Sequence, residues 1–469
     1  MSGSAATLPA RAPAVPVPAA DRTRPGGLAW ALGACVVVAA LTLLAPSQPT
    51  YDPWSWILWG REIAHGELST SFGPSWKPLP VALTTVFSLF GGIAPALWVV
   101  VARAGALAGL VYAFVLGRRL AGPWAGALAA VSLLVAPWYV RNAALANSEG
   151  LQVAFALAAV ERGLAGRRMP AFWLALGLAL LRPEAWPFLG LYGLWLVWRD
   201  RALLVPVAAG LISLPLLWLV PEQIGSGDWL RAAHRAQDPI SGSPADAANP
   251  LVEVVREGWD MLGGGSWLHW GLVAGLAGAL ALRDRRLLAV GALAAAWTVV
   301  VGAMTASGYS GNVRYLIVPA ALAIVLAASG IVLALRALRA PQLVVAAVAV
   351  GLAALFVVPW FDRTDAALEA ARYQAQMTGQ LPDVIERAGG ADRVLSCGTV
   401  TTGAYLVPAV AWQLDLHIDQ IALVPADPGT TLRVHTTNRS SALPTLLPLA
   451  GQPVHTLAFT PAWRIVTTC

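Results

Sequence analysis

The chain has 469 residues, of which 57% are hydrophobic and 12% charged, and its formal net charge is +6. These values are typical of a membrane protein and exclude an ordinary globular domain. The arginines are spread in small clusters, which does not indicate a nucleic-acid partner and suits the cytoplasmic loop ends of a protein in a lipid bilayer.

In chain order, the Ala/Pro-rich residues 1–26 predict a disordered cytoplasmic tail. Residues 27–360 predict a mostly α-helical transmembrane domain with about eleven crossings. With the N-terminus inside, every arginine cluster then falls on the cytoplasmic side of the plasma membrane. The loops at 47–96 and 221–265 and the C-terminal region fall outside. We expect crossings at about 27–46, 97–116, 123–140, 150–165, 170–181, 185–198, 202–220, 266–282, 287–305, 314–335 and 341–360.

Two segments depart from regular crossings. The run at 79–92 is short and opens with prolines, so it predicts a juxtamembrane or re-entrant helix. Counting it as a crossing would reverse the predicted orientation of every later crossing and place the arginine clusters outside. The runs at 170–181 and 185–198 are also short and meet at Leu181-Arg182-Pro183-Glu184. This junction predicts a helix break at membrane depth that lines a polar cavity.

Residues 361–469 predict a small extracytoplasmic α/β domain. It opens with a helical stretch from Asp365 to Arg387. Three strand-like pieces follow, at 393–396, 422–424 and 431–435. Cys397 and Cys469 could form a disulfide, which would require an oxidising compartment.

With this topology, polar side chains gather on the outer side of the membrane. Ionisable residues in membrane segments are costly and point to function. Lys77 is the one lysine of the chain, and its ammonium group suits an anionic ligand, although chance survival of a lone lysine is the alternative. The full group of candidates is Asp52, Lys77, Arg103, Glu149, Arg182, Glu184, Asn312, Arg314 and Tyr315.

Each candidate has a structural and a functional interpretation. Asp52 either caps a helix ahead of Pro53 or takes a proton from an acceptor hydroxyl. Glu149 either stabilises a helix N-terminus or orients the acceptor. If a divalent metal (Mg or Mn) is used, Glu149 and Asp52 would hold it. The cations either snorkel toward the interface or cradle a phosphate at the membrane surface. This last choice applies to Lys77, Arg103, Arg182 and Arg314.

This layout resembles the GT-C class of polytopic glycosyltransferases, which includes protein O-mannosyltransferases and lipid A aminoarabinose transferases. The resemblance covers residues 28–200 and, more loosely, 305–335. Lys77-Pro-Leu-Pro departs from the more usual His/Pro-Pro-Leu of the class. The motifs that carry the resemblance are the acid Asp52 in the first external loop, Trp76-Lys77-Pro78-Leu79-Pro80 running to Leu89-Phe90-Gly91, Ala102-Arg103-Ala104, Glu149, Arg182-Pro183 and Gly311-Asn312-Val313-Arg314-Tyr315-Leu316.

The resemblance implies inverting transfer of a sugar from a polyprenyl phosphate to a hydroxyl on a glycan, glycolipid or protein of the cell envelope. Asp52 would be the base, and the four cations would hold the departing phosphate. Trp54, Trp76, Glu184, Asn312 and Tyr315 would line the substrates. The Arg-rich, Lys-poor composition suggests an actinobacterium, in which polyprenyl-phospho-mannose (a mannosyltransferase reaction) and polyprenyl-phospho-arabinofuranose are candidate donors.

Two other functions fit parts of the sequence. A flippase or transporter of a lipid-linked substrate would explain broken helices and buried charges, but it predicts two related halves, which the sequence does not display. A non-catalytic scaffold of the cell envelope would use the C-terminal domain as its binding face. Such a scaffold would have no need for Asp52 and Lys77 beside one cavity.

Overall fold

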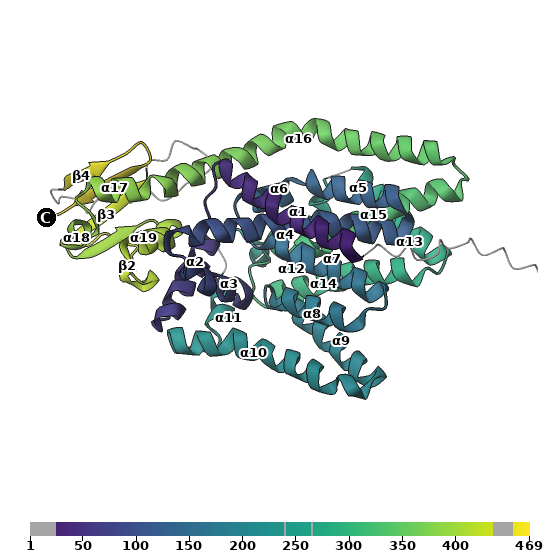
Figure 1. The fold of residues 1–469 in the computed structure, drawn as a ribbon, viewed down its shortest axis with the longest axis horizontal. Helices are drawn as coiled ribbons and strands as arrows, with labels where there is room; N and C mark the ends of the chain where they lie inside the picture. The colour runs from purple at the N-terminus through teal and green to yellow at the C-terminus, as the bar shows by residue number, and fades with distance from the viewer. Residues whose placement is uncertain (1–24, 239–240, 264–265, 435–453) are drawn as a thin grey trace, which may run out of the picture.

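The computed structural model describes residues 25–238, 241–263, 266–434 and 454–469. Most of the predicted tail at 1–26 therefore lies outside the described residues. The described chain is a bundle of helices with a small sheet at one end (Figure 1). The first half of the bundle consists of α1 (Pro25–Leu41), α2 (Tyr51–His65), α3 (Pro78–Ser88), α4 (Ala94–Ala121), α5 (Pro123–Leu134), α6 (Pro137–Ala144), α7 (Glu149–Leu164) and α8 (Arg168–Ala179).

The second half of the bundle begins after the break at Arg182-Pro183, which the structure confirms as a short 3-10 turn over Pro183–Ala185. Another 3-10 turn, Val313–Leu316, leads into α15. The helices of this half are α9 (Trp186–Arg199), α10 (Leu204–Ser226), α11 (Arg231–Ala236), α12 (Pro250–Asp260), α13 (Trp267–Ala281), α14 (Arg285–Ala306), α15 (Ile317–Ala337) and α16 (Gln342–Gly379).

The apolar helices make this a multi-pass membrane protein. Within the described ranges, five helices are long and apolar enough to span a bilayer, or six if the bent pair α5 and α6 counts as one span. That pair, predicted as a straight crossing at 123–140, bends by 61°. The predicted crossings at 150–165, 170–181, 185–198 and 266–282 form helices of 12 to 16 residues, and the one at 341–360 is the first part of α16, so the count of eleven stays a prediction. The short run at 79–92 forms α3, as expected.

Helix α15 is the centre of the bundle, because 83% of its apolar window is buried inside the protein. A helix that is apolar on every side suits such a position. It crosses α13 at a point where glycines allow the two backbones to touch. A Cβ atom at Gly330 would lie 2.3 Å from the backbone nitrogen of Gly275. Glycine at this crossing is therefore a packing requirement.

The C-terminal part has a five-stranded mixed sheet with the order β2-β1-β3-β5-β4. Strands β1 and β2 and strands β1 and β3 pair in parallel, whereas β5 pairs antiparallel with β3 and β4. The α/β prediction for this region is confirmed. Its elements are α17 (Leu381–Arg387), α18 (Ala391–Leu395), β1 (Thr399–Thr402), α19 (Val407–Leu414), β2 (Ile421–Ala422), β3 (Gly429–Val434), β4 (His455–Phe459) and β5 (Trp463–Thr467).

Two details of this region were predicted wrongly. The strand-like piece at 393–396 belongs mainly to helix α18. The last predicted crossing and the first helix of the soluble domain are one continuous helix, α16. Figure 1 shows α16 running along the outside of the bundle to the sheet, at the end where α2 and α3 also lie.

Candidate active site

Helix α2 carries Asp52 in its first turn, and Thr50 holds the N-cap position. The Thr50 hydroxyl donates to the Asn147 side-chain oxygen over 2.8 Å, which ties the start of α2 to the start of α7. Asp52 is thus not the capping residue that one interpretation predicted. Its Oδ2 atom instead accepts a hydrogen bond from Arg314 Nη1 at 2.9 Å.

Glu149 begins α7 and is fully buried. Its Oε1 atom accepts from Arg182 Nη2 at 3.0 Å and from Arg314 Nε at 2.7 Å. Arg182 also donates through Nε to Gln152 Oε1 at 3.0 Å, and its guanidinium lies 5.0 Å from the centre of the Tyr315 ring. A buried carboxylate needs such partners, because an unpaired charge away from water is costly.

Lys77 occupies the N-cap position of α3, outside the membrane-spanning helices, and is buried. Its Nζ atom donates to Ser148 Oγ at 3.1 Å and lies 4.8 Å from the centre of the Trp56 ring. No ion pair links it to a carboxylate of the described residues. Burial, together with the charges of Arg182 and Arg314, lowers the pKa of Lys77 to about 7, although Glu149 and Asp52 oppose the shift.

The packing of α2 against α3 holds this arrangement in place. A Cβ atom at Gly60 would lie 2.5 Å from the backbone of Thr84, so the two helices can approach this closely only with glycine. The Thr84 hydroxyl donates to the Trp56 carbonyl over 2.6 Å. The close contact therefore sets Trp56 beneath the Lys77 ammonium group.

Six of the candidates from the sequence share one contact network, which we call the cation cluster. Three cations face two carboxylates in it, which leaves one positive charge in excess. Asn312 joins this network by accepting from the Arg314 backbone amide at 3.0 Å. The cation cluster consists of Lys77, Arg182, Arg314, Asp52, Glu149 and Tyr315.

Arg103 does not join the cation cluster. Its guanidinium donates to the carbonyl and hydroxyl of Thr42, to the Ser47 hydroxyl and to the Ala144 carbonyl. These four bonds tie the end of α1 to α4 and α6. Arg103 therefore has a structural role here and is left out of the proposed phosphate site.

Among the described residues, no hydrogen bond, ion pair or ring contact joins the cluster to Trp54, Trp76 or Glu184. Trp54 packs against Trp412, and Trp76 packs against Trp59 while its Nε1 donates to the Leu217 carbonyl. Glu184 is buried in the turn before α9. These three residues line the neighbouring core, so their contact with a substrate remains untested.

Three residues outside the predicted site complete the cluster: Trp56, Ser148 and Gln152. Helical spacing could have found two of them. Trp56 follows Asp52 by four positions in α2, and Gln152 follows Ser148 by four, so each pair lies on one helix face. The Gln152 side chain indeed donates to Ser148 Oγ at 3.0 Å.

The cluster does not fit the divalent metal considered for Asp52 and Glu149. One guanidinium, that of Arg314, already binds both carboxylates. Across the described residues, no three His, Cys, Asp or Glu side chains gather around one point. A metal would also add charge to a cluster with a positive excess, so no step below is assigned to one.

An apolar cavity of about 200 Å³ opens next to the cluster, between α12, α13, α14 and α15. Leu316, two residues after Arg314, lines it. Leu272 of α13, Ala294 of α14 and Ala323 of α15 line it further along. One wall of the cavity is thus formed by the 3-10 turn that carries Arg314, and the cavity offers hydrocarbon surroundings along the spanning helices.

The C-terminal region is bound to α2, the helix that carries Asp52. Arg61 donates to the carbonyls of Trp412 at 3.2 Å and Leu416 at 2.9 Å. Glu62 is buried and accepts from His417 Nδ1 at 2.9 Å. Burial raises the pKa of Glu62, although the Ser69 amide and His417 oppose this shift. These contacts lie at the far end of α2 from Asp52.

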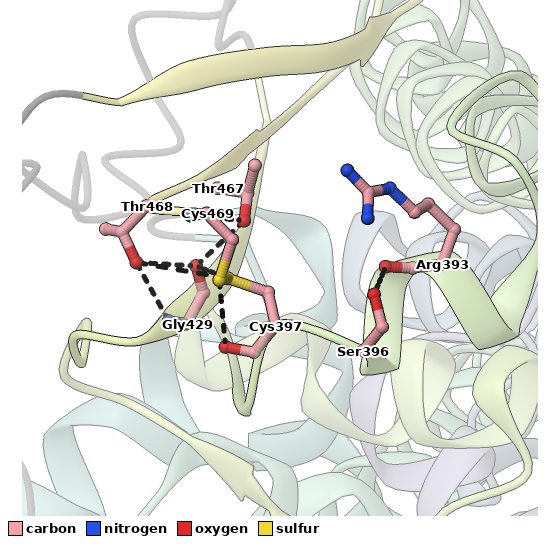
Figure 2. Close-up of a disulfide and its surroundings, with 7 residues drawn as sticks. All are labelled: Arg393, Ser396, Cys397, Gly429, Thr467, Thr468 and Cys469. Atoms are coloured by element: carbon pink, nitrogen blue, oxygen red, sulfur yellow. Dashed lines mark hydrogen bonds between the residues drawn. A yellow bond between two sulfur atoms is a disulfide. The ribbon is translucent and has the colours of Figure 1, made fainter.

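A disulfide joins Cys397 and Cys469, the pair considered from the sequence, with their Cα atoms 5.9 Å apart. Figure 2 shows it beside β3, where the Gly429 amide donates to the Thr468 hydroxyl over 3.0 Å. It links the segment before β1 to the residue that follows β5. The crosslink therefore fastens the C-terminal strand to the rest of the sheet.

No protein-family model matches this sequence, and no curated protein matches it. Among solved structures, it is similar to ArnT from Cupriavidus metallidurans bound to undecaprenyl phosphate, with a TM-score of 0.56 and 14% identity over 95% of this chain and 98% of that chain. The apo state of the same protein gives a TM-score of 0.53 and 15% identity over the same shares. ArnT is a lipid A aminoarabinose transferase of the GT-C class. The predicted GT-C type of fold is thereby confirmed.

Proposed function

We propose that this protein is an inverting glycosyltransferase that moves a sugar from a polyprenyl phosphate to an acceptor hydroxyl on the extracytoplasmic side of the plasma membrane. The observation that carries the proposal is the cation cluster, in which a positive excess lies beside Asp52. ArnT, which has a similar fold, was crystallised with undecaprenyl phosphate. That ligand is of the same class as the proposed lipid carrier.

The donor phosphate would bind where hydrogen-bond donors are unused. Lys77 donates one hydrogen bond, to Ser148, and the Nη2 atom of Arg314 is buried without a partner among the described residues. Arg182 is occupied by Glu149 and Gln152 and contributes mainly through its charge. Hydrogen bonds between cations and phosphate are the strong kind, so these groups would hold the phosphate and fix its position.

In the proposed reaction, the acceptor oxygen attacks the anomeric carbon of the sugar from the face opposite the phosphate. The new carbon–oxygen bond forms as the bond to phosphate breaks, and its electron pair leaves on the phosphate oxygen. Asp52 takes the hydroxyl proton. Lys77 and Arg314 stabilise the charge that grows on the phosphate, so the leaving group needs no proton.

The apolar cavity supports a lipid-linked donor. A polyprenyl chain attached to a phosphate at Arg314 would meet Leu316 first and could then follow the cavity between α12 and α15. Burial of hydrocarbon there stabilises the complex by about 0.8 kcal/mol per CH₂ group. We propose mannose or arabinofuranose as the sugar, and a glycan, glycolipid or protein of the cell envelope as acceptor.

The same proposal assigns sides of the membrane. We infer a cytoplasmic N-terminus and an extracytoplasmic C-terminal domain, for which the disulfide is the supporting observation, since disulfides persist in oxidising compartments. Alkaline phosphatase fused after Cys469 would be active in intact cells if this orientation is right. Activity only of a cytoplasmic reporter at that position would reverse the assignment.

The decisive test uses purified protein in nanodiscs with radiolabelled lipid extract from the host as donor. Donor binding and sugar release are measured for wild type, Asp52→Asn and Lys77→Met. We expect Asp52→Asn to bind donor without transfer, and Lys77→Met to lose donor binding. If none of the three binds donor, the transferase proposal fails, and a transporter or scaffold takes its place.

A further inference from the structure

Arg314 is the one cation of the cluster that contacts both carboxylates. Its Nε atom donates to Glu149 and its Nη1 atom to Asp52. The two carboxylates differ in what they would lose if Arg314 moved. Glu149 would keep Arg182, whereas Asp52 has no other ion-pair partner in the described parts of the chain.

A hydrogen bond from Arg314 to a phosphate would also satisfy a donor that now has no acceptor. The Nη2 atom of Arg314 is buried and unpartnered within the described residues, which costs free energy until an acceptor arrives. Lys77, the other cation with unused donors, belongs to the same cluster. One phosphate group bearing a single negative charge would neutralise the positive excess of the cluster.

The backbone of Arg314 is fixed by hydrogen bonds, and its side chain, which forms the two ion pairs, is partly exposed. Asn312 accepts from the Arg314 amide at 3.0 Å, and Arg182 Nη2 reaches the Arg314 carbonyl at 3.5 Å. The Arg314 side chain, in contrast, is 28% exposed. A fixed backbone with a long, partly exposed side chain allows a new rotamer without any shift of α15.

We propose that Arg314 is a positioning residue that exchanges Asp52 for the phosphate of the bound donor, so that Asp52 becomes free to accept a proton only when the donor is in place. This inference rests on the proposed function. In the empty site, the Oδ2 atom of Asp52 already accepts a charge-assisted hydrogen bond from the Arg314 guanidinium. Donor binding would release that oxygen beside the acceptor hydroxyl.

A double-mutant cycle on undecaprenyl phosphate binding tests the exchange, with this lipid standing in for the donor phosphate. If Asp52 competes with phosphate for Arg314, Asp52→Asn should tighten binding about tenfold in wild type, because it releases Arg314. In an Arg314→Gln background, the same change should alter affinity less than about twofold. Arg314→Gln alone should weaken binding about tenfold.

Arg119→Gln is the matched control. Glu161, at the other end of α7, is shared by Arg119 and Arg162, much as Glu149 is shared by Arg314 and Arg182. Arg119→Gln should leave undecaprenyl phosphate affinity unchanged. If Arg314→Gln does not fold, Arg314→Lys replaces it, because one ammonium group cannot bond both carboxylates as the guanidinium does.

The outcomes separate the two proposals. Equal tightening by Asp52→Asn in both backgrounds would overturn the exchange, even if undecaprenyl phosphate binds and Lys77→Met abolishes that binding. If undecaprenyl phosphate does not bind to the wild-type protein, the proposed function itself is wrong. A coupling confined to Asp52 and Arg314, with binding intact in wild type and in Arg119→Gln, supports both.

Discussion

The Lys77 ammonium group donates to the Ser148 hydroxyl over 3.1 Å, and no carboxylate of the described residues pairs with it. A buried ammonium group with a hydroxyl as its hydrogen-bond partner is under-satisfied, since it has three donors. The arrangement leaves N–H donors of Lys77 available to an anion. The sequence position of this lysine, at the N-cap of α3, aims it at the cluster between α2 and α7.

The first prediction is that Lys77→Met weakens undecaprenyl phosphate binding by about 10- to 100-fold. A hydrogen bond to a charged group contributes roughly 1.5–3 kcal/mol, which corresponds to this range. Methionine keeps the length and the contact with Trp56 but has no charge. The affinity is measured in nanodiscs, with Arg119→Gln as control. Unchanged affinity of Lys77→Met would remove Lys77 from the phosphate site.

The second prediction concerns pH. Because burial lowers the pKa of Lys77 to about 7, the ammonium form is lost as pH rises through 7 in the empty site. A bound phosphate favours the charged form and raises this pKa. The contribution of Lys77 to affinity should therefore be constant below about pH 6 and fall by up to about tenfold per pH unit above 7, until the pKa of the complex is reached.

The lipid phosphate titrates as well, with a second pKa near 6, so the wild-type curve alone is not diagnostic. Lys77→Met has only the titration of the phosphate and of the remaining groups. The ratio of wild-type to Lys77→Met affinity isolates the lysine contribution and should decline between about pH 6 and pH 9. A ratio that stays constant over this range would contradict a titrating Lys77.

How far the sequence predicts this site depends on what each signal measures. Treating intramembrane charges as functional led to Glu149, Arg182 and Arg314, which do meet. The same rule failed for Arg103, because hydropathy gives depth along a helix but not which neighbours surround it. Thr42 and Ser47 satisfy Arg103, and only tertiary packing brings them there.

The sequence likewise predicts some features of the fold and not others. Alternating apolar and charged segments indicated the helices, and the Arg-Pro pair marked a real break. The polar change near residue 361 predicts the boundary between the membrane domain and the C-terminal domain, yet α16 continues across it to Gly379. Strong helix formers such as Ala, Leu, Glu and Arg follow that point, so the polarity changes without a backbone signal to stop.

The third prediction places the lipid chain in the apolar cavity. Ala294→Phe should fill part of the cavity and weaken binding of undecaprenyl phosphate, because the chain loses apolar burial. Binding of geranyl phosphate, which has a short chain, should change little. Ala292, two residues earlier in α14, is exposed on the helix surface and is not among the cavity-lining residues, so Ala292→Phe is the matched control.

Comparing undecaprenyl phosphate with geranyl phosphate separates an effect on the lipid chain from an effect on the phosphate site. An equal loss for both chain lengths would show that Ala294→Phe disturbs the phosphate site and not the chain. No loss for either lipid would place the hydrocarbon elsewhere, for instance along another face of the bundle. A selective loss for the long chain supports the cavity as its site.

The fourth prediction is that the C-terminal domain holds α2 in its working position. Arg61 donates to the carbonyls of Trp412 and Leu416 at the end of α19 and pairs with Asp415 at 2.9 Å. Arg61→Ala leaves these carbonyls without their donor, which costs roughly 1–3 kcal/mol of stability. We expect a lower melting temperature and slower sugar transfer, because Asp52 lies on the same helix.

Binding of undecaprenyl phosphate should be nearly unchanged in Arg61→Ala, since Arg61 has no contact with the cation cluster in the described residues. Arg464→Ala is the control, because Arg464 is an exposed β5 arginine whose one hydrogen-bond partner among the described residues is Thr456. Melting temperature, lipid affinity and transfer rate are compared for the two variants. If both transfer sugar as fast as wild type, the domain does not position α2. A rate loss confined to Arg61→Ala, with lipid affinity retained, would mean that the contact acts on the orientation of Asp52 and not on the phosphate.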